Sequence, residues 1–72
     1  MSDFTWHDAW DTDDAIEALT RMGKDLASRG NYAQGGFLID CAKWIEEAQE
    51  KLDRTDIRAR ILARIDDLED LT

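Results

Sequence analysis

The fold is decided by residues 31–52, which read NYAQGGFLIDCAKWIEEAQEKL. The apolar residues of this stretch recur at the alternating three- and four-residue spacing of an amphipathic helix: Leu38, Cys41, Ile45, Ala48 and Leu52. Further apolar residues beside this stripe widen it to an arc that is typical of a central helix, contacted on two sides. We therefore predict a helix over residues 31–52 that packs between one helix before it and one after it.

Two flanking helices follow from the same spacing. Residues 12–29 carry an apolar stripe behind a run of aspartates, which suit the positive end of a helix dipole. Residues from about 55 to 71 repeat isoleucine and leucine at helical spacing. Short loops join antiparallel neighbours, so the predicted fold class is all-α: a small up-down-up three-helix bundle. Residues 1–72 make a single domain, in which residues 1–11 form an acidic aromatic arm or a short helix.

The predicted helix ends have local signals. Asp14 and Glu17 have the spacing of a capping box at the start of the first helix. Gly30 is placed to end that helix in the left-handed conformation, which glycine adopts without steric cost. Asn31 is expected to cap the second helix, with Gln34 three residues later. These signals predict a short connection between the first two helices.

The first ten residues hold half of the aromatic residues of the chain: Phe4, Trp6 and Trp10. A short turn capped by Thr5 would put Trp6 and Trp10 on one face, four residues apart. Two interpretations are open. A bundle this small gains stability when such an arm folds across it, which would make at least one Trp ring part of the core. Alternatively, the rings form an exposed aromatic peg for a partner.

Within residues 19–42, small and large residues follow a set order through both predicted helices and the turn between them: Gly23, Leu26, Gly30, Tyr32, Gly35, Ile39 and Ala42. In these residues the segment resembles a tetratricopeptide unit, a helical hairpin of fixed small and large positions. Leu19 stands where that motif begins with Trp, and its terminal Pro is absent near Glu47. The resemblance implies a close helix crossing at Gly23 and Gly35. It implies no peptide-binding groove, because a solenoid needs several stacked repeats.

The chain lacks the residues of common catalytic and metal sites. His7 is the single histidine and Cys41 the single cysteine, so the chain has neither an internal disulfide nor a cysteine-based zinc site. A serine or cysteine nucleophile would have to recruit His7 from the arm, and we predict no catalytic residue. His7 and Asp11 lie among aspartates that lack the spacing of a calcium loop, so we predict no metal and no cofactor. The start of the chain is too acidic for a signal peptide and no apolar run suits a membrane helix, so the cytoplasm is the expected location.

All eight units of net negative charge can be assigned to the two ends of the chain. Residues 1–20 hold six acids and residues 65–72 hold four, with no Lys or Arg in either segment. The residues between them carry nine bases and seven acids. Acidic ends repel nucleic acids and suit a basic surface on a larger protein. The predicted partner-binding residues are acids of both ends and two arm tryptophans: Asp8, Asp11, Asp13, Asp14, Asp66, Asp67, Glu69, Asp70, Trp6 and Trp10.

The third predicted helix carries its charges in an order that opposes its dipole. Arginines occupy its front half and acids its back half, whereas a helix dipole favours anions first and cations last. One solution is a two-fold dimer of antiparallel third helices, with an interface of six residues: Ile57, Arg60, Ile61, Arg64, Leu68 and Leu71. The other solution is internal. Arg54 and Arg58 would then lie near the acids of residues 11–14, and the bases of the first helix near those of residues 66–70.

Two functions fit these patterns. The first is a small acidic, non-catalytic interaction protein that occupies a basic surface of a larger partner. In its strongest form it mimics the charge of nucleic acid and blocks a nucleic-acid-binding machine, acting in the host cytoplasm if phage-encoded. In size, charge and fold class it then resembles phage-encoded inhibitors such as anti-CRISPR proteins. The alternative is a homodimeric structural or adaptor module with solubilising acidic ends. Neither hypothesis includes direct binding of nucleic acid or a membrane.

Overall fold

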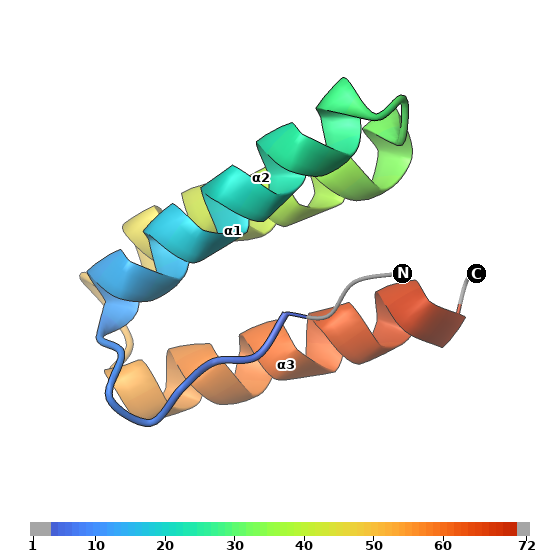
Figure 1. The fold of residues 1–72 in the computed structure, drawn as a ribbon. Coiled ribbons are helices and arrows are strands. Elements are labelled where there is room, and N and C mark those ends of the chain that lie inside the picture. The colour runs from blue at the N-terminus through green and yellow to red at the C-terminus, as the bar shows by residue number, and fades with distance from the viewer. Residues whose placement is uncertain (1–3, 71–72) are drawn as a thin grey trace.

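The structure is a computed structural model that describes residues 4–70, with side chains described through residue 67. Its three helices are α1 (Thr12–Ser28), α2 (Tyr32–Ala48) and α3 (Arg54–Asp70). The helices alternate in direction along the long axis of the molecule, as Figure 1 shows. α1 and α2 pack closely along their lengths, and α3 lies across them together with the N-terminal arm. The predicted all-α, up-down-up bundle is therefore confirmed.

α1 begins with a capping box, although not with the predicted residues. Asp11 is the N-cap, because its extended backbone turns into the helix at the next residue. The Asp14 N–H donates to Asp11 Oδ1 at 3.0 Å, and the Asp11 N–H donates to Asp14 Oδ2 at 3.4 Å. The prediction that Asp14 and Glu17 form the box is wrong, since the helix starts three residues earlier than that pairing requires.

The turn between α1 and α2 depends on one glycine. Gly30 has φ of +91°, which confirms the predicted left-handed conformation. The next residue, Asn31, donates its backbone N–H to the Leu26 carbonyl oxygen at 2.9 Å and so closes the end of α1. The prediction that the Asn31 side chain caps α2 is wrong. This side chain donates to Gln34 Oε1 at 2.8 Å and makes no hydrogen bond to the backbone of the helix start.

α2 ends at Ala48, four residues before the predicted end. The N–H groups of Lys51 and Leu52 both donate to the Ala48 carbonyl oxygen at 2.8 Å, which tightens the chain into a turn. Asp53 then caps α3, accepting the Asp56 N–H at 2.9 Å. The apolar spacing of α2 continues to Leu52 because this residue still packs against the core from the turn. Spacing alone therefore overestimated the length of the helix.

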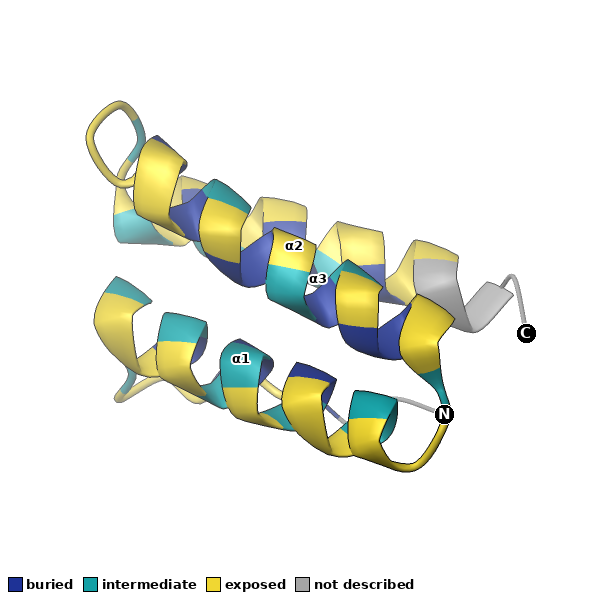
Figure 2. Cartoon of the chain, turned by 90° about the horizontal axis from the view of Figure 1, so that it is seen from above, coloured by how far each residue is buried: buried dark blue, intermediate teal, exposed yellow. Residues whose placement is uncertain are grey.

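The core receives residues from all three helices and from the arm. Its largest fully buried side chains are Trp6, Leu19, Leu38, Cys41, Ile45, Ile57 and Ile61. Buried positions alternate with exposed ones along each helix, as Figure 2 shows, so each helix turns one side to the interior. α2 contributes more of the described buried residues than either neighbour, as expected for the central helix.

The backbones of α1 and α2 approach each other most closely at two glycines. A Cβ atom added to Gly23 would lie 2.7 Å from the Gly35 carbonyl oxygen, and one added to Gly35 would lie 2.5 Å from the Gly23 carbonyl oxygen. Real Cβ atoms do not come this close to backbone oxygens. The close crossing at Gly23 and Gly35 is therefore confirmed. Gly36 takes no part in it, because a Cβ there would meet no atom within 4 Å.

The N-terminal arm runs antiparallel to α3 along one side of the molecule (Figure 1). Residues 4–10 form an extended segment with a turn at residues 8–9, so they take the arm form rather than the short-helix form. Trp6 is 1% exposed and Phe4 is 8% exposed. The prediction that at least one arm tryptophan belongs to the core is thus confirmed for Trp6.

Candidate functional site

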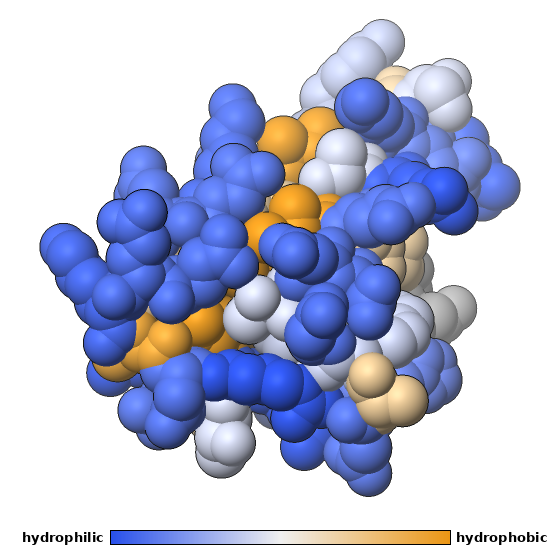
Figure 3. All heavy atoms as spheres, turned by 90° about the vertical axis from the view of Figure 1, so that its left-hand side faces the viewer, coloured by the Kyte–Doolittle hydropathy of each residue, from blue (hydrophilic) through white to orange (hydrophobic). Residues whose placement is uncertain are grey.

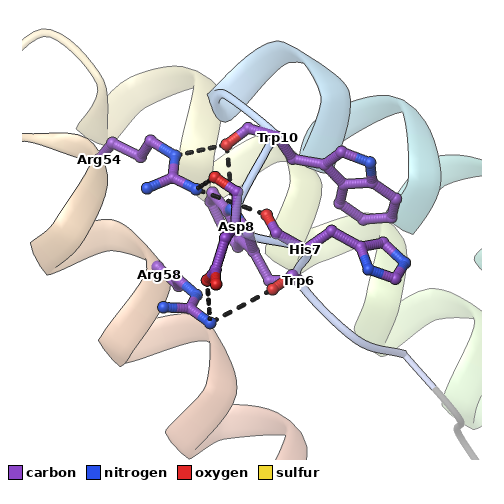
Figure 4. Close-up of polar contacts among 6 residues, drawn as sticks. All are labelled: Trp6, His7, Asp8, Trp10, Arg54 and Arg58. Atoms are coloured by element: carbon purple, nitrogen blue, oxygen red, sulfur yellow. Dashed lines mark hydrogen bonds and ion pairs between the residues drawn. The ribbon is translucent and has the colours of Figure 1, made fainter.

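Arg54, the first residue of α3, binds the turn of the arm through backbone carbonyl groups (Figure 4). Its guanidinium donates to the carbonyl oxygens of Trp10 and of Asp8, the latter at 2.6 Å, with a longer contact of 3.4 Å to His7. These carbonyls converge because the chain turns at residues 8–9, where the Trp10 N–H also donates to the His7 carbonyl. A planar guanidinium has several donors in a fixed fork, which suits such a group of acceptors.

Arg58, one turn further along α3, binds the same segment. Its Nη2 lies 3.1 Å from Asp8 Oδ1 and donates to the Trp6 carbonyl oxygen at 3.4 Å (Figure 4). The Asp8 side chain is 92% exposed, so this ion pair contributes little to stability. The two arginines therefore hold the arm mainly through hydrogen bonds to its backbone.

The arginines at the start of α3 were predicted to pair either with a second copy or with acids of the same chain, and these contacts answer that question in part. Internal compensation exists at its front half, but the acceptors are the arm and Asp8 rather than the acids of residues 11–14. Among the described side chains, no base of α1 forms an ion pair with Asp66 or Asp67, and the side chains of Glu69 and Asp70 lie outside the described part. Arg21 pairs instead with Glu17 at 2.7 Å, and Arg29 with Asp25 at 3.1 Å, both within α1.

The acids face outward. All fourteen acidic residues whose side chains the structure describes are exposed, whereas Arg54 and Arg58 are half-buried against the arm. Four of the predicted partner-binding acids lie at one end of the molecule or beside it: Asp8, Asp11, Asp13 and Asp14. Asp66 and Asp67 lie toward the other end, and the side chains of Glu69 and Asp70 lie outside the described part of the chain.

The prediction that Trp6 binds a partner is wrong. Trp6 is 1% exposed and is held inside the core, so its ring is not available to a partner. Its indole N–H donates to the Trp10 carbonyl oxygen at 3.4 Å. The Trp10 ring is half-buried and packs edge-on against His7, with ring centroids 4.7 Å apart.

The tertiary structure enlarges the acidic end at the start of α1. The up-down-up topology brings the start of α1, the end of α2 and the start of α3 together, which adds Glu50, Asp53 and Asp56 to this end. Thr12 Oγ1 donates to Gln49 Oε1 at 2.9 Å, and this hydrogen bond joins the start of α1 to the end of α2. Figure 3 views this end: hydrophilic side chains cover most of it, and an apolar strip shows between them.

A groove that the sequence analysis missed lies between α2 and α3. It has a volume of about 330 Å³. Its apolar wall consists of Trp44, Ala48 and Leu52, and its charged rim consists of Glu47, Lys51 and Arg60. The Arg64 guanidinium carbon lies 4.7 Å from the centroid of the Trp44 ring, a cation–π contact. The one feature of the sequence that could have indicated this groove was the position of Trp44 at the edge of the apolar stripe of α2.

The predicted dimer interface requires correction. Ile57 and Ile61 are fully buried in the core of a single chain, because α3 turns this stripe toward α1, α2 and the arm. They are not available to a second copy. Arg60 and Arg64 are exposed at the surface of α3, whereas the Leu68 side chain and Leu71 lie outside the described residues.

The described residues contain no group of three or more His, Cys, Asp or Glu side chains that could hold a metal ion. Among the same residues, no helix combines the length and the apolar character needed to cross a membrane. Neither a protein-family model nor a curated protein nor a solved structure matches the chain. Its function must therefore be argued from its own surface.

Cys41 is 1% exposed, and burial raises the pKa of its thiol, with a partial opposing effect of the nearby Arg64 charge. We expect the thiol of the native protein to react with Ellman's reagent far more slowly than the thiol of the unfolded chain.

The raised pKa of Cys41 in the folded state also makes the stability of the protein depend on pH. The contribution of the protonated thiol to the free energy of unfolding is complete below the ordinary thiol pKa of about 8.5 and is lost as the pH rises above it. Thermal denaturation at pH 7 and pH 10 should show a smaller pH-dependent loss for Cys41→Ala than for the native chain. An equal loss would contradict this role of the thiol.

Proposed function

We propose that the chain is a small, non-catalytic interaction protein of the cytoplasm that occupies a basic surface of a larger partner. The observation that carries this proposal is the outward orientation of all fourteen described acidic side chains, while Arg54 and Arg58 are engaged by the arm. The net charge of −8 is therefore carried by acids at the surface, of which only Asp8, Glu17 and Asp25 form ion pairs among the described side chains. Such a surface steers a basic partner toward the protein and rejects polyanions.

The arrangement of the acids supports a partner with basic groups at more than one place. The end that contains the start of α1 also carries acids of the α2–α3 connection and of α3, and Asp66 and Asp67 lie toward the opposite end. The long axis of the molecule measures 33 Å. Basic grooves that hold a nucleic-acid backbone present cations over distances of this size, because phosphates follow one another along the duplex. In its strongest form, the protein competes with nucleic acid for such a groove, as an anti-CRISPR-like or DNA-mimic-like inhibitor of phage type does.

The experiment is affinity capture with the immobilised chain from a lysate of the host, at low and at high salt. We expect basic nucleic-acid-binding proteins to be captured at low salt and lost at high salt, because exposed charges are screened. Added duplex DNA should displace them. Capture that resists both salt and duplex DNA would overturn the proposal.

Matched variants locate the contact on the captured partner. Asp13→Asn with Asp14→Asn removes two charges from one end, and Asp66→Asn with Asp67→Asn removes two charges toward the other. An exposed ion pair contributes about 0.2–1 kcal/mol, so the loss of two should lower the affinity roughly 2- to 30-fold. The control, Asp40→Asn with Glu46→Gln, removes the same charge from exposed positions within α2 and should have a smaller effect. Equal losses in all three variants would mean that only net charge matters.

A further inference from the structure

The outer face of α3 carries charges that have no partner among the side chains the structure describes. Arg60 is exposed and makes neither an ion pair nor a hydrogen bond there, and the same holds for Asp67. The other three arginines of α3 are engaged, since Arg54 and Arg58 bind the arm and Arg64 lies over Trp44. The charge order that opposes the helix dipole is thus compensated internally at the front of α3 but not at its middle.

Arg60 and Asp67 lie on one face of α3, because seven residues make almost two full helical turns. Ala63 lies between them, is exposed, and leaves room for a second helix to approach. In an antiparallel pair of α3 helices centred between residues 63 and 64, Arg60 of each copy faces Asp67 of the other. A two-fold axis therefore makes two identical ion pairs, and it also opposes the two helix dipoles.

The groove between α2 and α3 lies beside this face, since Arg60 forms part of its rim. The groove is apolar at Trp44 and Leu52, and its rim carries the cations Lys51 and Arg60 against the single acid Glu47. An occupant must therefore bring apolar and acidic groups together. Residues 66–71 of a second copy, with the sequence DDLEDL, have this composition. In the register that joins Arg60 to Asp67, the exposed Asp66 and Asp67 of the second copy lie beside the groove.

We infer that the protein forms a two-fold dimer in which antiparallel α3 helices pair Arg60 with Asp67 and close the groove between α2 and α3. This goes beyond the proposed function, which needs no second copy. The net charge of −8 on each copy opposes association, so we expect the dimer to form only as the protein concentration rises.

The test is sedimentation equilibrium of the full chain from low to high micromolar concentration. We expect the mass to rise toward twice 8.3 kDa. Arg60→Glu places two acids opposite each other at each contact, and Asp67→Lys places two bases there, so each variant alone should remain monomeric. An equimolar mixture of the two variants restores opposite charges at both contacts and should recover the dimer.

Two controls change charge by the same amounts elsewhere. Lys24→Glu matches Arg60→Glu, and Asp13→Lys matches Asp67→Lys, at exposed positions outside this face. Both controls should remain dimeric, and far-UV circular dichroism should show that every variant keeps its helices. The inference is overturned if the native chain stays monomeric, as it would if the groove served a different protein. It is equally overturned if the single variants dimerise, or if their mixture does not.

Discussion

Replacing Trp6 with alanine is expected to cost about 3–5 kcal/mol of the free energy of unfolding, the usual range for a large aromatic residue removed from a core. Trp6 is the largest of the fully buried side chains. A domain of 72 residues has a total stability of about 4–11 kcal/mol. We therefore expect Trp6→Ala to lower the melting temperature by more than ~12 °C, or to abolish the cooperative transition, in thermal denaturation followed by circular dichroism.

The physical reason is that Trp6 is the most deeply buried of the three arm rings, Phe4, Trp6 and Trp10, that pack against the core. The arm has no helix of its own, and it is held by this ring, by Phe4 and by the hydrogen bonds of two arginines. Loss of the ring removes buried apolar area and also releases the backbone carbonyls that Arg54 and Arg58 contact. The stability of the bundle and the attachment of the arm are therefore expected to fall together.

Trp10→Ala is the matched control, since it removes the same ring from a half-buried position in the same segment. We expect a clearly smaller loss, because the free energy follows the apolar area taken from water. Trp6→Phe keeps a large apolar ring and should fall between the two. Equal effects of Trp6→Ala and Trp10→Ala would show that the arm is not attached to the core through Trp6.

Gly35→Ala is expected to destabilise the protein although alanine is the better helix former. The new Cβ would lie 2.5 Å from the Gly23 carbonyl oxygen and 3.0 Å from the Ala27 backbone nitrogen. Neither atom belongs to a flexible side chain, so α1 and α2 must move apart. Such overpacking costs about 1–3 kcal/mol, which exceeds or cancels the gain of about 1 kcal/mol in helix propensity.

Gly36→Ala is the control for this prediction, in the same helix and one residue away. A Cβ at Gly36 meets no atom within 4 Å, so this variant should gain about 0.5–1 kcal/mol. Urea denaturation of the two variants and the native chain measures the difference directly. A Gly35→Ala variant as stable as Gly36→Ala would mean that the two helices separate without cost, and that the glycines do not set their distance.

Much of the fold followed from local patterns. The helical spacing located all three helices to within a few residues, and Gly30 marked the turn because a left-handed backbone favours glycine. The close crossing at Gly23 and Gly35 could be anticipated only from the resemblance of residues 19–42 to a tetratricopeptide unit. The cap of α1 was misplaced, since several aspartates in a row offer the same hydrogen-bond acceptor at neighbouring positions.

The candidate surface was predictable only in part. The acids were expected at both ends, and short polar side chains at helix ends have little reason to be buried. Their gathering at one end was not visible in the sequence, because the start of α1 and the start of α3 come to the same end only through the topology. The dimer residues Ile57 and Ile61 were misassigned because an apolar stripe shows that a face is covered but not what covers it.

The sequence by itself determined where the helices lie, how the first turn is made and that the net charge is concentrated toward the ends of the chain. Periodicity, left-handed glycine geometry and composition are local properties, and each can be recognised without a partner. Only the tertiary structure decided that Arg54 and Arg58 bind the arm, that Trp6 lies in the core and that Trp44 borders a groove. The acceptors for the two arginines are mostly backbone carbonyls, which every residue carries, so no residue type marked them in advance.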